Sequence, residues 1–148
     1  MPRHIINISG GKDSTALVVY MNKKYPIFDY EYIFCDTGCE LPETYKYLDK
    51  IEKMLSIRIT RLNSHKPFEF YLEKMNGYLP SPFARWCTRE MKIKPWEEYV
   101  GYDDVNSYIA IRSDEDRKGY ISSKKNVHPV YPFVDDSITL VDVHRILV

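Results

Sequence analysis

The sequence of 148 residues contains neither a long hydrophobic run nor an excess of charge of either sign. No stretch approaches the roughly 20 apolar residues of a transmembrane helix, and the N-terminus lacks the pattern of a secretory signal. Lysine and arginine together number 21, as do aspartate and glutamate, so the formal net charge is zero. We therefore expect a cytoplasmic protein with no membrane partner and no evident nucleic-acid surface, whose anion sites are built locally.

Cysteine is also scarce, because the chain has only Cys35, Cys39 and Cys87. An odd number of cysteines in a chain expected to be cytoplasmic argues against a disulfide framework and favours reduced thiols or metal ligands. No internal repeat, linker or low-complexity segment divides the sequence, of which 44% is hydrophobic and 28% is charged. Length and composition together predict one globular domain over residues 1–148.

Apolar runs rich in β-branched residues alternate with helical patterns along the chain. These runs predict strands over residues 4–8, 30–35, 55–62 and 107–111. Helices are predicted near residues 16–21, 42–55, 67–75 and 88–100, and a capping box of Thr139 and Asp142 predicts a last short helix. The alternation predicts an α/β fold with a mainly parallel sheet flanked by helices, in which ligands bind beyond the C-terminal ends of the strands.

The stretch between the first predicted strand and the first predicted helix carries the strongest functional signal. Its residues are Ser9, Gly10, Gly11, Lys12, Asp13, Ser14 and Thr15. Two adjacent glycines let the backbone approach an anion closely, and the N–H groups of the first helical turn then point at that anion. Lys12 adds a positive charge, and the hydroxyl groups can donate hydrogen bonds. The spacing matches neither the nucleotide P-loop nor the dinucleotide-binding glycine motif.

Polar residues also follow the second and fourth predicted strands. Residues 35–40 read Cys-Asp-Thr-Gly-Cys-Glu, and residues 112–117 read Arg-Ser-Asp-Glu-Asp-Arg. A third polar stretch, residues 85–89, enters the helix that continues past Lys92. Because the carboxyl ends of parallel strands meet at one edge of a sheet, we expect these residues to lie near the anion-binding loop.

Five segments, in the same order along the chain, resemble the phosphoadenosine phosphosulfate (PAPS) reductase family of the adenine nucleotide alpha-hydrolase, or PP-loop, superfamily. They are residues 9–15, 36–44, 85–87 with Lys92, 111–115, and 130–133 with residues 142–143. The resemblance covers almost the whole chain. It implies a Rossmann-like PP-loop fold that binds an adenine nucleotide, either ATP or PAPS.

The resemblance and the residue types suggest roles at the strand ends. Residues 9–15 would hold the pyrophosphate of ATP or the phosphosulfate group of PAPS, and Asp13 would hold a magnesium ion. Other residues expected at the nucleotide are Asp36, Thr37, Gly38, Asp114 and Arg117. Charge on phosphate or sulfate oxygens would be neutralised by Lys12, Arg85, Arg89, Lys92, Arg112 and Arg117. The alternative for residues 114–117 is a surface loop whose charges pair with one another.

Two reactions and one role without catalysis are compatible with these residues. PP-loop enzymes cleave ATP between its α- and β-phosphates and adenylate an acceptor, here unidentified, without a protein nucleophile. Sulfonucleotide reduction instead needs a thiolate, which the reductases carry in a C-terminal Glu-Cys-Gly-x-His segment absent from these 148 residues. The third reading is a nucleotide-binding subunit or sensor, with residues 131–134 and 146–148 as an apolar surface for a homodimer or a partner subunit.

The cysteines add two hypotheses at the same predicted edge. Cys35, Cys39 and Cys87 could together hold a [4Fe–4S] cluster, as in some sulfur-transfer relatives of the superfamily. Alternatively, Cys87 is a reactive thiol made acidic by Arg85, Arg89 and a helix start. Cys35 falls within a predicted strand, where cysteine is commonly a small buried hydrophobic residue. The candidates for catalysis are Lys12, Arg85, Cys87, Lys92 and Arg112.

Overall fold

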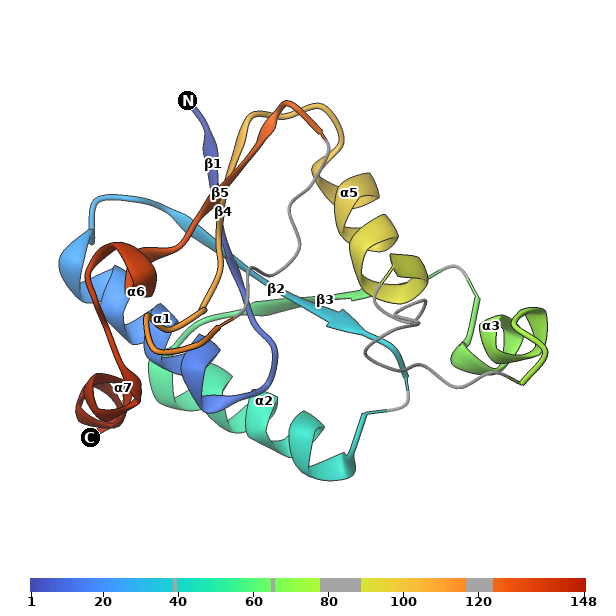
Figure 1. The fold of residues 1–148 in the computed structure, drawn as a ribbon, viewed down its shortest axis with the longest axis horizontal. Helices are drawn as coiled ribbons and strands as arrows, with labels where there is room; N and C mark the ends of the chain where they lie inside the picture. Colours follow the sequence, from blue (N-terminus) through green and yellow to red (C-terminus); the bar gives the residue numbers. More distant parts are fainter. Residues whose placement is uncertain (39, 65, 78–88, 117–123) are drawn as a thin grey trace.

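The computed structural model describes residues 1–38, 40–64, 66–77, 89–116 and 124–148. A single sheet of five parallel strands lies at its centre, in the order β3-β2-β1-β4-β5 (Figure 1). The strands are β1 (Arg3–Asn7), β2 (Tyr30–Asp36), β3 (Ile59–Asn63), β4 (Val105–Tyr108) and β5 (Val127–Val130). The predicted α/β class and parallel sheet are confirmed, and the order reverses direction between β1 and β4, where ligands bind in open α/β sheets.

β1 and β2 lie within one residue of their predicted limits, two strands differ by more, and one strand was not predicted. β3 begins at Ile59 because α2 (Pro42–Leu55) continues to Leu55 and the chain then turns at Ser56, whose φ is +53°. β4 ends at Tyr108, before the predicted end at residue 111. β5 contains Pro129, which weakens its sequence signal, and it is tolerated because β5 is an edge strand of the sheet.

Helices cover both faces of the sheet (Figure 1). One face carries α1 (Lys12–Lys24), α2, α6 (Pro132–Asp135) and α7 (Leu140–Leu147), which contribute to one hydrophobic cluster. The other face carries α5 (Lys94–Val100), whose Val100 packs with Ile5, Ile33 and Val105. α3 (Phe68–Lys74) lies at the periphery, beyond α5. Asp142 Oδ2 accepts the amide of Thr139 at 2.9 Å, which confirms the predicted capping box at the start of α7.

The helix predicted over residues 88–100 is divided in two. A π-helical turn, η1 (Arg89–Ile93), runs directly into α5. Pro95 lies in the first turn of α5 and has no amide hydrogen, so it cannot supply an α-helical hydrogen bond to the preceding turn. Such π-helical turns are frequent at functional sites, and this one carries Lys92.

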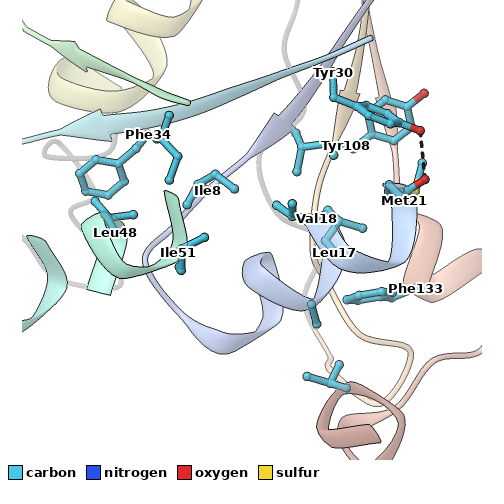
Figure 2. Close-up of a cluster of buried hydrophobic side chains, with 14 residues drawn as sticks. Ile8, Leu17, Val18, Met21, Tyr30, Phe34, Leu48, Ile51, Tyr108 and Phe133 are labelled. Atoms are coloured by element: carbon cyan, nitrogen blue, oxygen red, sulfur yellow. Dashed lines mark hydrogen bonds between the residues drawn. The ribbon is translucent and has the colours of Figure 1, made fainter. Parts of the chain in front are cut away.

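The larger hydrophobic cluster lies between the sheet and α1, with α2, α6 and α7 around it (Figure 2). Alternate strand residues face opposite sides, so Ile6, Ile8 and Phe34 enter this cluster while Ile5 and Ile33 face α5.

None of the described helices is both long and apolar enough to cross a bilayer.

We predict that Leu48→Ala lowers the free energy of unfolding by about 2–5 kcal/mol, because it leaves a cavity in this cluster. Leu48 is 0% exposed, whereas Met54 on the same helix is 70% exposed. The matched control Met54→Ala is expected to change stability little, by about 0.5 kcal/mol or less. Urea unfolding followed by circular dichroism measures both, and equal losses in the two variants would contradict the packing described here.

Candidate functional site

The loop between β1 and α1 is a candidate anion cradle built from backbone amides. β1 ends at Asn7, α1 begins at Lys12, and the N-cap residue is Gly11, which has no side chain to cap the helix. The amide of Thr15 donates to Gly11 O at 3.3 Å, so the amides before it precede the hydrogen-bonded ladder of the helix. These N–H groups and the helix dipole favour an anion, and the exposed Lys12 adds a full positive charge.

The two glycines of the loop differ in backbone conformation and in the space available for a side chain. Gly10 has a φ of +85°, and a Cβ there would lie 2.8 Å from Cγ2 of Thr44 on α2. Gly11 has a φ of −105°, which any residue adopts, and a Cβ would make ordinary contact with Ser9 Oγ at 3.6 Å. Gly10 therefore needs glycine for its backbone conformation and for the space beside Thr44, while the close approach of Gly10 and Gly11 to an anion stays a prediction.

The hydroxyl groups of the loop form hydrogen bonds within the loop and with α2. Ser14 Oγ and Thr15 Oγ1 both donate to Gly11 O, at 3.2 and 3.0 Å. Ser14 Oγ also accepts the amide of Ser9 at 3.1 Å, and Thr15 Oγ1 lies 3.0 Å from the hydroxyl of Tyr47 on α2. These bonds hold the backbone in place and leave the amides and Lys12 as the groups best placed for an anion.

An ion pair connects this loop to the segment that follows β4. Arg112 Nη1 lies 3.0 Å from Asp13 Oδ2, and Arg112 Nε donates to Asp114 Oδ1 at 3.0 Å. The second oxygen of Asp114 accepts the amide of Leu140, the first residue of α7, at 3.3 Å. The segment thus pairs partly with itself, as in the surface-loop reading, and partly with Asp13 at the start of α1, while its contact with a nucleotide stays a prediction.

This network keeps its groups charged. Its hydrogen bond to Asp114 raises the pKa of Arg112, and the same bond lowers the pKa of Asp114. Asp13 and Arg112 are mostly buried, with side-chain exposures of 19% and 15%, so their attraction is only partly screened by water. Asp13 Oδ1 is buried, has no hydrogen-bond partner among the described residues, and lies 4.0 Å from Lys12 Nζ.

A tight turn follows β2, as the sequence predicted. Asp36 Oδ1 accepts the amide of Gly38 at 2.8 Å and the hydroxyl of Tyr45 at 2.7 Å. Thr37 Oγ1 donates to Glu40 Oε1 at 3.2 Å, and Gly38 has a φ of +78°. Asp36 therefore shapes the turn and attaches it to α2, while its contact with a nucleotide stays a prediction.

Cys35 lies on the face of the sheet opposite the Asp13–Arg112 pair. Its thiol donates to the carbonyl oxygen of Lys92 in η1 at 3.4 Å. Burial raises the pKa of the Cys35 thiol to about 11, and the positive charge of Lys92 opposes that rise. Cys35 is thus a neutral thiol near pH 7, which does not suit a nucleophile.

A cavity of about 220 Å³ opens on this second face, beneath η1 and α5. Its polar lining comes from Asn7, Cys35, Lys92, Trp96 and Ser107. Asn7 Nδ2 donates to Ser107 Oγ and to Tyr108 O, both at 2.9 Å, and so ties β1 to β4. Asn7, Trp96 and Ser107 were not predicted as site residues, although a polar residue within an apolar strand run was a usable signal for Asn7 and Ser107.

Several predicted site residues lie outside the described part of the chain: Cys39, Arg85, Cys87 and Arg117. Arg89 is described through its backbone alone, at the start of η1. Among the described residues, no group of three or more metal-ligating side chains is present. The [4Fe–4S] hypothesis needs Cys39 and Cys87 and therefore stays a prediction, as does the reactive Cys87.

Comparison with known proteins gives one family match and several longer relatives. Residues 3–131 match the model of the phosphoadenosine phosphosulfate reductase domain. The uncharacterized proteins MJ0066 and MJ0973 of Methanocaldococcus jannaschii are 31% and 32% identical over 86% and 84% of this chain, which spans 28% and 32% of their lengths. The nin region protein ORF290 of Escherichia phage lambda, also uncharacterized, is 26% identical over 78% of this chain. This chain spans 50% of the length of that protein.

Solved structures share the fold at low sequence identity. A PAPS reductase from Candida auris, in complex with phosphate, superposes with a TM-score of 0.73 and 13% identity, covering 99% of this chain and 72% of that one. The U34-tRNA thiolase NcsA from Methanococcus maripaludis, solved with its [4Fe-4S] cluster, superposes with a TM-score of 0.65 and 18% identity, covering 98% of this chain and 55% of that one. A predicted subunit of a tRNA methyltransferase from M. jannaschii superposes with a TM-score of 0.57 and 17% identity, covering 98% of this chain and 73% of that one.

We predict that the two glycines of the cradle respond differently to alanine. Gly10→Ala forces a side chain into a left-handed backbone against Thr44, at a cost of about 1–2 kcal/mol for the conformation plus the clash. Gly11→Ala keeps an extended backbone and has space, so its melting temperature is expected to stay near that of the wild type. Calorimetry measures the melting temperatures of both variants. A larger drop in melting temperature for Gly11→Ala than for Gly10→Ala would contradict this geometry.

We further predict that Cys35 resists alkylation at neutral pH. With a pKa of about 11, its reaction with iodoacetamide should be slow at pH 7.5 and rise steeply only above pH 10. Lys92→Met removes a charge that lowers this pKa, so the rise should move to still higher pH. Peptide mass spectrometry follows Cys35 separately from the other cysteines, and half-maximal labelling near pH 8.5 would contradict the burial described.

Proposed function

Because the chain belongs to the phosphoadenosine phosphosulfate reductase domain family, we propose that it binds an adenine nucleotide and acts at the α-phosphate of ATP. An oxygen of an acceptor substrate attacks the α-phosphorus and forms a new P–O bond. The bond to the β-phosphate breaks, pyrophosphate leaves, and AMP remains on the acceptor. The observation that carries this proposal is the convergence of Arg112, from the segment after β4, on the cradle that follows β1.

The cradle suits a departing pyrophosphate. Negative charge grows on that group as the bond breaks, and amides at a helix start together with Lys12 stabilise it without rearranging. Arg112 has a planar guanidinium that can bind two phosphate oxygens at once, and its bond to Asp114 holds it beside the loop. A phosphate would compete with Asp13 for the same guanidinium.

Asp13 supports a magnesium ion in the same site. A carboxylate beside a phosphate-binding loop repels the anion unless a cation lies between them. Asp13 Oδ1 is a buried oxygen without a hydrogen-bond partner among the described residues, and carboxylate oxygen is a ligand that magnesium accepts. Magnesium would neutralise the phosphate charge, with Asp13 as its protein ligand.

Sulfonucleotide reduction is the second candidate, favoured by the description of the matching family. That reaction requires a thiolate to attack the sulfur of PAPS. Within the described residues, Cys35 is held as a neutral thiol, so the nucleophile would have to come from Cys39, Cys87 or another chain. Chemistry at the α-phosphate needs no such group and agrees better with the described site.

A nucleotide-binding subunit without turnover is the third candidate. The chain spans less than a third of the two M. jannaschii relatives and half of the phage relative. Further parts of a longer protein, or a partner subunit, could therefore complete the site and supply the acceptor. The product assay below separates this role from catalysis.

We predict that Lys12→Ala weakens ATP binding about 10- to 100-fold, the range for loss of one charge-assisted hydrogen bond. Lys23→Ala is the matched control, because Lys23 is an exposed lysine at the other end of α1. Calorimetric titration with ATP and with PAPS, each with and without magnesium, measures the affinities. Equal affinity in the two variants would place the phosphates elsewhere.

Product analysis then assigns the reaction. Release of AMP and pyrophosphate from ATP with magnesium supports the proposed chemistry and starts a search for the acceptor. Tighter binding of PAPS than of ATP favours the reductase candidate and a nucleophile from outside the described residues. Binding of ATP without products, in the presence of candidate acceptors, favours the non-catalytic subunit.

A further inference from the structure

One face of α2 contacts the loop between β1 and α1 at two points. Thr44 and Tyr47 lie three residues apart on α2 and therefore share a face of the helix. Thr44 packs beside Gly10, where a Cβ would lie only 2.8 Å from Thr44 Cγ2. The hydroxyl of Tyr47 lies 3.0 Å from Thr15 Oγ1, near the start of α1. The second contact is a hydrogen bond, so it has a direction as well as a distance.

The donor in this hydrogen bond follows from the other bond that the threonine makes. A threonine hydroxyl has one hydrogen, and Thr15 Oγ1 donates it to the carbonyl oxygen of Gly11 at 3.0 Å. The hydrogen between the two hydroxyl groups therefore belongs to Tyr47, which donates to Thr15 Oγ1. A chain of two hydrogen bonds thus runs from α2, through Thr15, to Gly11, the N-cap residue of α1.

This chain selects one orientation of the Thr15 side chain. Threonine in a helix divides between two χ1 rotamers, because its hydroxyl can bond to a carbonyl of the preceding turn. Thr15 is only 7% exposed, so water does little to stabilise the alternative orientation of its hydroxyl. The donor on Tyr47 therefore favours the rotamer in which Thr15 Oγ1 meets Gly11 O.

The Gly11 carbonyl in turn sets the direction of an amide of the candidate cradle. Gly11 C=O and Lys12 N–H belong to one planar trans peptide group and point in opposite directions. Gly11 O accepts from Thr15 N at 3.3 Å, from Thr15 Oγ1 at 3.0 Å and from Ser14 Oγ at 3.2 Å. These donors all lie inside the first turn of α1, so the Lys12 amide is directed out of the helix start, where an anion would bind.

We propose that Tyr47 is a positioning residue for anion binding at this loop. Its hydroxyl acts through Thr15 and holds the Gly11–Lys12 peptide with the Lys12 amide turned toward the anion, without contact between Tyr47 and the ligand. The inference rests on the proposed function, because it takes pyrophosphate to bind at this loop. An amide that is already held in place stabilises the charge growing on pyrophosphate without rearranging.

The test is calorimetric titration of matched variants with pyrophosphate, with and without magnesium. Tyr47→Phe keeps the ring and removes the donor. Tyr32→Phe is the matched control, because both tyrosines are partly buried and pack against the larger hydrophobic cluster. The hydroxyl of Tyr32 accepts from Asn22 Nδ2 at 2.9 Å, toward the other end of α1. Each substitution therefore removes one hydroxyl contact with α1, and only Tyr47→Phe does so beside the loop.

We expect Tyr47→Phe to weaken pyrophosphate binding about threefold to tenfold, the range for loss of one hydrogen bond, and Tyr32→Phe to leave it unchanged. Melting temperatures should fall by similar, small amounts in both variants, so a loss of stability alone would not produce this difference. Thr15→Val removes the hydroxyl through which Tyr47 acts. The double variant should therefore bind pyrophosphate no more weakly than Thr15→Val alone, whereas independent effects would multiply.

Two results would overturn the inference: equal pyrophosphate affinity in Tyr47→Phe and Tyr32→Phe, or the same weakening by Tyr47→Phe with and without the Thr15 hydroxyl. If Lys12→Ala weakens pyrophosphate binding and Tyr47→Phe does not, the proposed site stands and Tyr47 has no positioning role. Failure of the proposed function has a different signature. In that case pyrophosphate does not bind the wild type, or binds Lys12→Ala and Lys23→Ala equally, and the inference falls with the site.

Discussion

The ion pair between Asp13 and Arg112 is the contact on which the candidate site depends. It joins two segments 99 residues apart in sequence, the start of α1 and the segment after β4, at the point where the strand order of the sheet reverses. Asp114 carries the connection on to the first amide of α7, and α7 packs on α1 through the shared hydrophobic cluster. The start of α1 is thus tied to the segment after β4 and, through Asp114, to α7, and a phosphate bound at the loop would meet a guanidinium already in position.

The sheet separates two chemical environments at one edge. On the α1 face lie charged groups, backbone amides and the Asp13 carboxylate, one oxygen of which has no hydrogen-bond partner among the described residues. On the α5 face lie a cavity with mainly uncharged lining residues, beside Lys92, and a thiol whose pKa is raised by burial.

Local sequence patterns predicted most elements, and the failures have physical causes. The start of α2 at Pro42 and the capping box of α7 rest on contacts within one helical turn, and both are as predicted. β5 was missed because Pro129 interrupts a short edge strand, whose pairing with β4 replaces the local signal. The π-helical turn before Pro95 was read as ordinary helix, since the sequence periods of the two differ by too little over five residues.

The sequence by itself determined the parallel α/β fold, the family and the place of the glycine-containing loop between β1 and α1, because each follows from neighbouring residues and their order along the chain. Gly10 and Gly11 are adjacent in the same motif. Only the tertiary structure shows that a side chain at position 10 would meet Thr44, whereas one at position 11 would have space. The tertiary structure alone decided that Arg112 meets Asp13, that Cys35 is a half-buried thiol with a raised pKa, and that the indole nitrogen of Trp96 is buried without a hydrogen-bond partner among the described residues. Each of these depends on side chains from separate strands and helices, whose distances and burial are set only when the sheet is assembled.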